Sequence, residues 1–465
     1  MSTRLLIISH DVVGARMAGP GIRAYHLARV LARHTPTTLA VPNAAEPALS
    51  EHGFAVIPYT RGDWSTLAAQ VAAADVCLVA CDTLNDFPQL AELDLCLVID
   101  GYDPLLAEWL ALHPHLTPAE LAPHWRERMV QLTRQYLCGD FYLCASERQR
   151  DWWLGLLEAS GRINPHTHHA DPSLRSLIDL VPYGLDGAPP RRTQPVIKGV
   201  WEGIGADDKV ILWGGGLWPW LDPFTAIRAV GEIQRARRDV RLVFPGTKHP
   251  NPVMATMQTH TPAAMALADE LGLLNRAVFF GEWIPYSSWD DVLLDSDVAL
   301  TLHHDTLETR LAFRSRIFEY IRAGLPIVAT EGDATSELVT RFAVGRAVGY
   351  GAVGEVAAAI LALLAAPTGE QAAAFAHARS QLTWARAAEP LVSFCQNPRR
   401  APDRTGASAS GNPFYAPPSP ADQAERASLL AQIDQQAALI AAYERGLFMR
   451  AMRAVAGVRR RLFRG

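Results

Sequence analysis

Short apolar runs alternate with helix-like stretches along the chain up to about residue 380. Apolar runs between amphipathic segments are typical of strands in a parallel sheet, which helices cover on both faces. The pattern therefore predicts an α/β protein. We expect strands at residues 4–9, 76–80, 95–99, 141–144 and 177–181 in the first half, and at 209–213, 240–244, 277–280, 298–302 and 326–330 in the second. Helices are expected at residues 21–33, 147–159, 224–235, 262–271 and 313–322.

The two halves begin in the same way, with a strand, a glycine-rich turn and a helix. Gly19-Pro20-Gly21 provides the turn in the first half, and Gly214-Gly215-Gly216 provides it in the second. A Pro-rich polar stretch at 186–195 separates the halves and is typical of an interdomain linker. We therefore predict two doubly wound, Rossmann-like domains in tandem, at 1–186 and 208–396, joined by a linker at 187–207. Because ligands of such sheets bind beyond the carboxyl ends of the strands, the two domains would share one cleft.

The last part of the chain has a different composition. Residues 397–420 are rich in Pro, Ser, Ala and Gly, which predicts a flexible linker. Residues 421–465 have a helical pattern, with seven arginines from Arg445 to Arg464 and no acid after Glu444. The apolar face beside these arginines predicts an interfacial helix that binds an anionic membrane surface. A helix that pairs with a partner, or that packs back on the core, is the alternative.

Length and composition exclude several classes of protein. The 465 residues exceed what one core holds, and 49% apolar with 20% charged residues indicates a soluble globular protein. The net charge is only −5, so we expect no general attraction to nucleic acid. The six cysteines lack metal-ligand spacing, so we expect them to be buried thiols in a reducing compartment. Cys77 and Cys81 could form a redox pair. No apolar run has the length of an export signal or a membrane span, so we expect a cytoplasmic protein, peripheral at the inner face of the cell membrane where its tail binds.

The densest cluster of chemistry lies at residues 302–330, directly after a predicted strand. A helix that begins near Phe313 would place Arg314 and Arg316 in its first turn, where free amides and the helix dipole already favour an anion. Their planar guanidinium groups suit a diphosphate. Glu319 follows on the same helix, where its carboxylate could accept both hydroxyls of a ribose.

This segment resembles the donor-site motif of retaining glycosyltransferases of the GT-B fold, family 4. In that motif a carboxylate, a helix and a second carboxylate precede a Gly-x-Pro turn, here Gly324-Leu325-Pro326, and an apolar strand. Other segments resemble the branch of the family that assembles bacterial surface polysaccharides, and the resemblance spans residues 4–396. These segments are Gly19-Pro20-Gly21-Ile22-Arg23, Asp100-Gly101-Tyr102-Asp103-Pro104, residues 145–155, Gly161-Arg162-Ile163-Asn164-Pro165, Val181-Pro182-Tyr183-Gly184, residues 212–216 and Trp220-Leu221-Asp222-Pro223.

The resemblance implies a GT-B enzyme that moves a sugar from a nucleotide-diphosphate donor to a glycan or lipid-linked acceptor, with retention, in cell-surface polysaccharide assembly. Charge builds up on the leaving diphosphate during transfer, so cations and amides aimed there lower the barrier. No cofactor and no metal are expected, because the nucleotide sugar is a substrate and arginines take the place of a cation. We expect the donor to be bound by Gly214, Gly215, Gly216, Arg314, Arg316 and Glu319. The expected catalytic residues are Asp103, Glu308 and Arg316, and the expected acceptor or phosphate loop contains Gly19, Gly21 and Arg23.

The sequence departs from the family's pattern in three places. The usual motif has two glutamates eight positions apart, but Leu311 stands eight positions before Glu319, so Glu308 is expected to contact the sugar instead. The basic pair that the family places after the first strand of its second domain is replaced by the glycine turn, so Arg314 and Arg316 would substitute for it. The histidine that often follows the fifth strand is also missing, and Asp103 in that loop would position or deprotonate the acceptor hydroxyl.

Several alternatives stay open at this point. A sugar-nucleotide epimerase of the same fold would have its own paired acids and histidine, and a non-catalytic relative would bind the nucleotide sugar without turnover. His303, His304 and Glu308 could bind a metal, but a further ligand cluster is missing from the sequence. Asp103 precedes a proline and could be only a turn former. Ser146 is predicted to be the N-cap of the helix that follows it.

Overall fold

The computed structural model describes residues 3–46, 49, 53–80, 83–186, 188–247, 260–367, 369, 371–404, 428, 432, 435 and 436. Nearly all of the expected tail helix, with its arginines from Arg445 to Arg464, lies outside the described residues, as does Cys81. Among the described residues, no helix combines the length and the apolar character needed to span a membrane.

The first sheet has seven parallel strands in the order β3-β2-β1-β4-β5-β6-β7. They are β1 (Leu5–Ile8), β2 (Thr37–Val41), β3 (Ala55–Pro58), β4 (Val76–Ala80), β5 (Cys96–Asp100), β6 (Phe141–Cys144) and β7 (Ile178–Leu180). Leu5 pairs with both Thr37 and Val76, which places β1 in the centre of the sheet. Every residue of β1 is buried, as expected for a central strand with helices on both faces.

Helices connect these strands, and we call this half of the fold the first lobe. They are α1 (Gly19–Leu31), α2 (Ala68–Ala73), α3 (Thr83–Asp86), α4 (Leu105–Ala111), α5 (Pro118–Cys138), α6 (Glu147–Ala159) and α7 (Pro165–Ala170). The Ser146 hydroxyl accepts a hydrogen bond from the Gln149 amide at 3.1 Å, which confirms the predicted N-cap of α6. Thr117 and Glu120 form a capping box at the start of α5.

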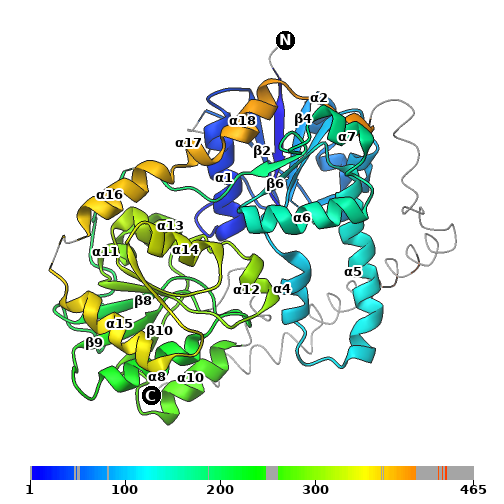
Figure 1. Ribbon diagram of the computed structural model, residues 1–465. Helices are drawn as coiled ribbons and strands as arrows, with labels where there is room; N and C mark the ends of the chain where they lie inside the picture. The colour runs from blue at the N-terminus through cyan, green and yellow to red at the C-terminus, as the bar shows by residue number, and fades with distance from the viewer. Residues whose placement is uncertain are drawn as a thin grey trace, which may run out of the picture. The chain divides into compact units, whose positions relative to one another are not determined.

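The second sheet has six parallel strands in the order β10-β9-β8-β11-β12-β13. They are β8 (Lys209–Trp213), β9 (Val240–Phe244), β10 (Val278–Phe280), β11 (Val298–Thr301), β12 (Ile327–Thr330) and β13 (Gly345–Val348). The helices of this second lobe are α8 (Pro223–Ile233), α10 (His260–Glu270), α11 (Trp289–Leu294), α12 (Leu307–Leu311), α13 (Arg316–Ala323), α14 (Ala334–Arg341) and α15 (Val353–Ala365). The two sheets and their helices confirm the predicted α/β class (Figure 1).

After the second sheet the chain returns to the first lobe. It does so through α16 (Ala372–Gln381), α17 (Trp384–Ala387) and α18 (Glu389–Gln396), and Figure 1 shows α17 beside α1. The Trp384 ring stacks on His26 of α1 at 5.1 Å, and Phe394 stacks on Phe141 of β6 at 4.8 Å. Both sheets belong to one compact unit, Met1–Ser410.

The residues after α18 differ from the expectation of a flexible linker from 397 onward. Ala401 is buried, and Asp403 forms a buried ion pair with Arg162 of the first lobe, with 2.6 Å between Oδ2 and Nε. Arg400 and Arg404 both reach the buried carboxylate of Asp140. Proline-rich composition predicted a linker, but these charge pairs hold residues 400–404 against the first lobe.

Candidate functional site

The glycine turn after β8 lies against the first residue of α13. The Gly214 amide donates to the Tyr320 hydroxyl at 2.9 Å, which ties the turn to the helix. Gly215 has a φ of +118°, and a Cβ added there would lie 3.3 Å from Nη2 of Arg316. Glycine is needed at this position both for the backbone conformation and for the close approach of the guanidinium group.

Several hydrogen-bond donors at this turn have no acceptor among the residues that the structure describes. Arg316 makes no ion pair with any described residue, and its buried Nη1 atom has no hydrogen-bond partner. Within the described part of the chain, the Gly215 and Gly216 amides also donate to no acceptor. Burial lowers the pKa of the Arg316 guanidinium, and the nearby charge of Arg314 adds to this effect. Unpaired donors around a half-buried cation are suited to an anion.

A buried charge cluster lies beside this turn in the second lobe. Arg314 donates from Nη1 and Nη2 to the two carboxylate oxygens of Glu308, at 2.8 and 2.7 Å. Asp333 lies 3.6 Å from Arg314 Nε and 3.0 Å from Nε2 of His303. Burial alone would raise the pKa of Asp333, but His303, Arg314 and the Ser336 amide hold it at about 2. Burial also lowers the pKa of His303, so the cluster combines two carboxylates with one permanent cation.

Two expectations for this segment are corrected by its geometry. The helix expected from Phe313 begins at Arg316, because the preceding residues bond to other elements. The Phe313 carbonyl accepts from the Tyr102 hydroxyl, and the Arg314 amide donates to the Thr335 hydroxyl at 3.4 Å. Arg314 therefore precedes the first turn, and its guanidinium group is occupied by Glu308. Of the three glycine amides expected to face a phosphate, that of Gly214 is also already bonded.

Glu319 is buried on α13 and is held by an arginine of the same helix. Arg322 donates from Nε and Nη2 to the Oε2 atom of Glu319, at 2.9 and 2.8 Å, and neither bond uses Oε1. Burial raises the pKa of Glu319, while Arg322 opposes that rise. Arg322 thus fixes one oxygen of the carboxylate, and within the described part of the chain no hydrogen bond reaches the other.

In the first lobe, Arg23 is a structural cation. It donates to the Asp100 carboxylate at 2.7 and 2.9 Å, and to the carbonyl groups of Val181 and Pro182 at 2.8 and 3.1 Å. Its guanidinium carbon also lies 4.6 Å from the centre of the Tyr102 ring. Four of its five N–H groups are therefore used within the protein, so Arg23 joins strand ends rather than offering a free cation to a phosphate.

The two glycines of the first turn have different surroundings. A Cβ on Gly21 would lie 2.1 Å from the Val12 carbonyl oxygen, so glycine is needed there for packing alone. A Cβ on Gly19 would lie 3.4 Å from the Ser315 hydroxyl, which is ordinary contact distance. Gly19 thus brings the start of α1 against the start of α13, whereas Gly21 supports the fold.

Asp103 lines a small cavity of about 40 Å³ at the carboxyl ends of β1 and β5. His10, Arg23 and Asp100 line the same cavity. Burial raises the pKa of Asp103 to about 6, His10 and Arg23 oppose the rise, and Asp100 and Glu308 add to it. The Tyr102 hydroxyl, one residue before Asp103, donates to the Phe313 carbonyl, so Asp103 lies close to the boundary between the lobes.

Polar contacts join the lobes around this site. The Gln149 side chain donates to the carbonyl groups of Tyr102 and Leu311, both at 2.7 Å. Arg148 pairs with Glu337 at 2.5 Å, and the Tyr286 amide donates to the Ala15 carbonyl at 2.9 Å. The predicted residues of both halves therefore lie on facing surfaces of one region.

Neither a protein-family model nor a curated protein sequence matches the chain. Its structure is similar to that of HepE (Alr3699) from Anabaena in complex with UDP and glucose, with a TM-score of 0.60 and 16% identity over 85% of this chain and all (100%) of that one. Sucrose-phosphate synthase from Thermosynechococcus elongatus gives a TM-score of 0.59 and 15% identity, over 84% of this chain and 98% of that one. WaaG, a glycosyltransferase involved in lipopolysaccharide biosynthesis, gives a TM-score of 0.56 and 14% identity, over 85% of this chain and 100% of that one.

The chain has the GT-B fold. The predicted residues that this GT-B structure brings together are Arg316, Gly215 and Gly216 in the second lobe, with Asp103 and Gly19 facing them from the first. Among the described residues, no group of three or more His, Cys, Asp or Glu side chains is arranged to hold a metal ion.

Sequence reasoning missed three contributors to this GT-B site. His10 follows the first strand directly, and its position at a strand's carboxyl end was the available signal. Gln149 lies within the segment 145–155 that carried the resemblance, but its bond to Leu311 joins residues 162 positions apart. Asp333 resembles an ordinary N-cap in the sequence, and its carboxylate does accept from the Thr335 and Ser336 amides.

Proposed function

We propose that this chain is a glycosyltransferase that takes its sugar from a nucleotide-diphosphate donor. The observation that carries this proposal is the unpaired guanidinium group of Arg316 above Gly215, with the free Gly215 and Gly216 amides beside it. A diphosphate bound here would accept hydrogen bonds from these donors, for which the described residues provide no acceptor. The complex of HepE with UDP and glucose supports a nucleotide-sugar donor for this fold.

The same donors would act in the transfer step. Negative charge grows on the β-phosphate as its bond to the sugar breaks, so a cation and amides already aimed there stabilise the transition state more than the bound donor. Glu319 would accept from the ribose hydroxyls through Oε1, because Arg322 fixes its other oxygen. Arg322 thus acts as a positioning residue.

The remaining predicted residues receive narrower roles. Asp103 would hold the acceptor hydroxyl from the first lobe, and its carboxylate would take up the proton that the new bond displaces. Glu308 would act through Arg314, because both carboxylate oxygens already accept from that side chain. We assign Gly19 to the contact between the two turns, and Arg23 and Gly21 to the support of the first lobe.

The finer assignments extend the resemblance in the sequence. We propose a family 4 enzyme that retains the anomeric configuration and works without a resident cofactor or metal. Its acceptor would be a glycan or a lipid-linked sugar of a cell-surface polysaccharide. The arginine-rich tail would hold the enzyme at the inner face of the membrane, where such acceptors lie.

The test is release of nucleoside diphosphate from a panel of UDP-, GDP- and ADP-hexoses, with and without a lipid-linked acceptor. A transferase releases the diphosphate from one donor, and releases it faster with acceptor. Interconversion of the free donor sugar without release would identify an epimerase. Binding of a donor with neither reaction would indicate a non-catalytic relative, and would contradict the proposal.

A further inference from the structure

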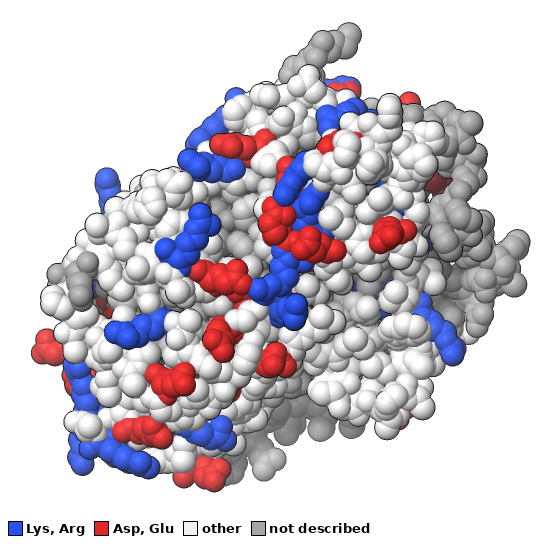
Figure 2. Space-filling model, in the orientation of Figure 1, with Lys and Arg blue, Asp and Glu red and all other residues white. Residues whose placement is uncertain are grey.

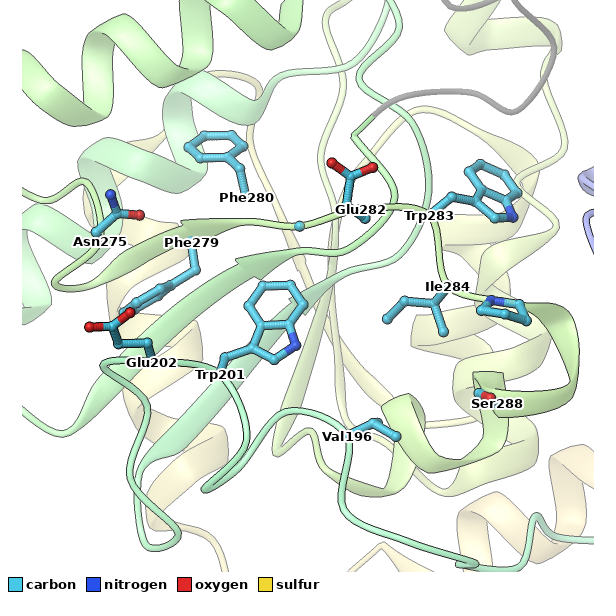
Figure 3. A pocket seen from close by; sticks show the side chains of 12 residues that line it. Val196, Trp201, Glu202, Asn275, Phe279, Phe280, Glu282, Trp283, Ile284 and Ser288 are labelled. Carbon is cyan, nitrogen blue, oxygen red and sulfur yellow. The ribbon is translucent and has the colours of Figure 1, made fainter. Parts of the chain in front are cut away.

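A groove of about 520 Å³ runs along β10, which is the edge strand of the second sheet. Figure 3 shows Trp201, Phe279 and Glu202 on one side of this strand, and Phe280 and Glu282 on the other. The groove therefore lies along the edge of the second sheet. Its size is within the range of sites that hold small ligands.

The aromatic walls of the groove are held in fixed positions. A Cβ added to Gly281 would lie 2.2 Å from the Trp201 ring, so this ring rests directly on the backbone that follows β10. Trp283 packs in the same way against Gly246, where an added Cβ would lie 3.3 Å from its ring. Rigid indole groups offer large apolar surfaces at a small cost in conformational entropy.

The charged side chains in the described part of the groove are both carboxylates. Glu202 and Glu282 are exposed, and neither makes an ion pair with another described residue. Asn275 adds an exposed amide, and the described residues that line the groove include no Lys, Arg or His. Two carboxylates without a cation repel a phosphate, so this groove is unsuited to the diphosphate that Arg316 would bind.

We propose that the groove is a second carbohydrate site, which binds a neutral or amino-bearing pyranose of a glycan. The C–H face of a pyranose ring is apolar and packs on an indole ring, while its hydroxyl or ammonium groups donate to carboxylates at the rim. Aromatic rings flanked by unpaired carboxylates match both parts of such a ligand. An acidic sugar would be excluded by charge.

The chain connects this groove with the contact between the lobes. Ile284 and Ser288 line the groove, and between them Tyr286 donates its amide to the Ala15 carbonyl at 2.9 Å and places its hydroxyl 3.2 Å from His26 Nε2. A glycan held in the groove would therefore lie beside the segment that joins the two lobes. The identification of this glycan as the growing acceptor rests on the proposed function. Sugar binding in the groove does not.

Isothermal titration of the full-length protein tests the proposal with four probes: maltotriose, the trimer of glucosamine, trigalacturonic acid and tetramethylammonium. We expect the first two to bind and the last two not to bind. In the double variant Glu202→Gln and Glu282→Gln, affinity for the glucosamine trimer should fall about tenfold, as the loss of a charge-assisted hydrogen bond predicts. Trp201→Phe should weaken both trisaccharides while leaving the fold intact. Glu270→Gln, at an exposed carboxylate on α10 outside the groove, is the matched control and should change nothing.

Three results would overturn the proposal: no binding of either trisaccharide at millimolar concentration, tetramethylammonium binding as tightly as the glucosamine trimer, or displacement of a trisaccharide by UDP. Arg316→Ala separates this site from the donor site, because it should leave trisaccharide binding unchanged. Trisaccharide binding in a protein that binds no nucleotide would contradict the proposed function and leave the groove as a carbohydrate site.

Discussion

Arg314 and Glu308 face each other in the interior of the second lobe and share two parallel hydrogen bonds, of 2.8 and 2.7 Å. Arg314 also lies 3.6 Å from Asp333, so it is the only cation between two buried carboxylates among the described residues of this cluster. Removal of the cation therefore leaves two unpaired charges, whereas removal of Glu308 leaves Arg314 still paired with Asp333.

We expect Arg314→Ala to destabilise the protein by about 3–5 kcal/mol, the range for a broken buried ion pair. Glu308→Gln should cost less than half as much, because Asp333 still compensates the arginine. Thermal unfolding of both variants beside the unmodified protein measures the difference. Equal losses would show that Asp333 does not share the cation.

Residues 400–404, which pack on the first lobe, should also stabilise the protein through a buried ion pair. Asp403 is the buried partner of Arg162, with bonds of 2.6 and 3.0 Å, so Asp403→Ala should cost about 3–5 kcal/mol. Asp94, which is fully exposed beside Arg400, is the matched control. Asp94→Ala should leave the melting temperature unchanged, and an equal loss in both variants would contradict a structural role for residues 400–404.

The two glycines of the first turn should differ in how far their replacement destabilises the protein. Gly21→Ala would force a Cβ to within 2.1 Å of the Val12 carbonyl oxygen, so we expect a loss of about 1–3 kcal/mol. Gly19→Ala meets only ordinary contact distances and should keep the melting temperature. If Gly21→Ala unfolds at the same temperature as Gly19→Ala, the close approach at Val12 is not a constraint.

The pH dependence of activity should report Asp103. Because burial raises its pKa to about 6, the carboxylate is charged above that pH and protonated below it. Because this carboxylate is proposed to take up the proton of the acceptor hydroxyl, kcat/KM should fall as the pH drops through about 6, by about tenfold per pH unit. Asp103→Asn should lower kcat/KM and abolish this limb of the profile. A limb that persists in the variant would show that Asp103 is not the group that titrates.

The sequence predicted most of the buried strands but few of the contacts within the site, for a physical reason. Strands such as β4, β6 and β8 are continuous apolar runs, and their predicted bounds agree with the structure. Three strands were missed: β2, although most of it is buried, and the edge strands β3 and β13. In β13 two of the four residues are exposed, so it has no apolar run. The start of α13 was placed too early, because the bonds of Phe313 and Arg314 to Tyr102 and Thr335 are made only in the folded chain.

The sequence also does not reveal which charged side chains pair with each other. Residue types placed Arg314, Arg316 and Glu319 in one segment, but did not tell which arginine is neutralised. Only the fold shows that Glu308 pairs with Arg314 while Arg316 stays unpaired. Figure 2 shows acidic and basic side chains interspersed on the face in view, so a local unpaired cation says more about ligands than the net charge does.

Arg316 and the glycine turn are proposed to bind a nucleoside diphosphate, and every role assigned to the site depends on this binding. Thermal shift of the purified protein with UDP, GDP, ADP and CMP tests it directly, because a ligand that binds only the folded state raises the melting temperature. We predict that one diphosphate stabilises the unmodified protein and the control Arg346→Ala, whose side chain is exposed on β13, but neither Arg316→Ala nor Glu319→Ala. A shift that survives in Arg316→Ala, or no shift with any of the four nucleotides, would contradict the claim.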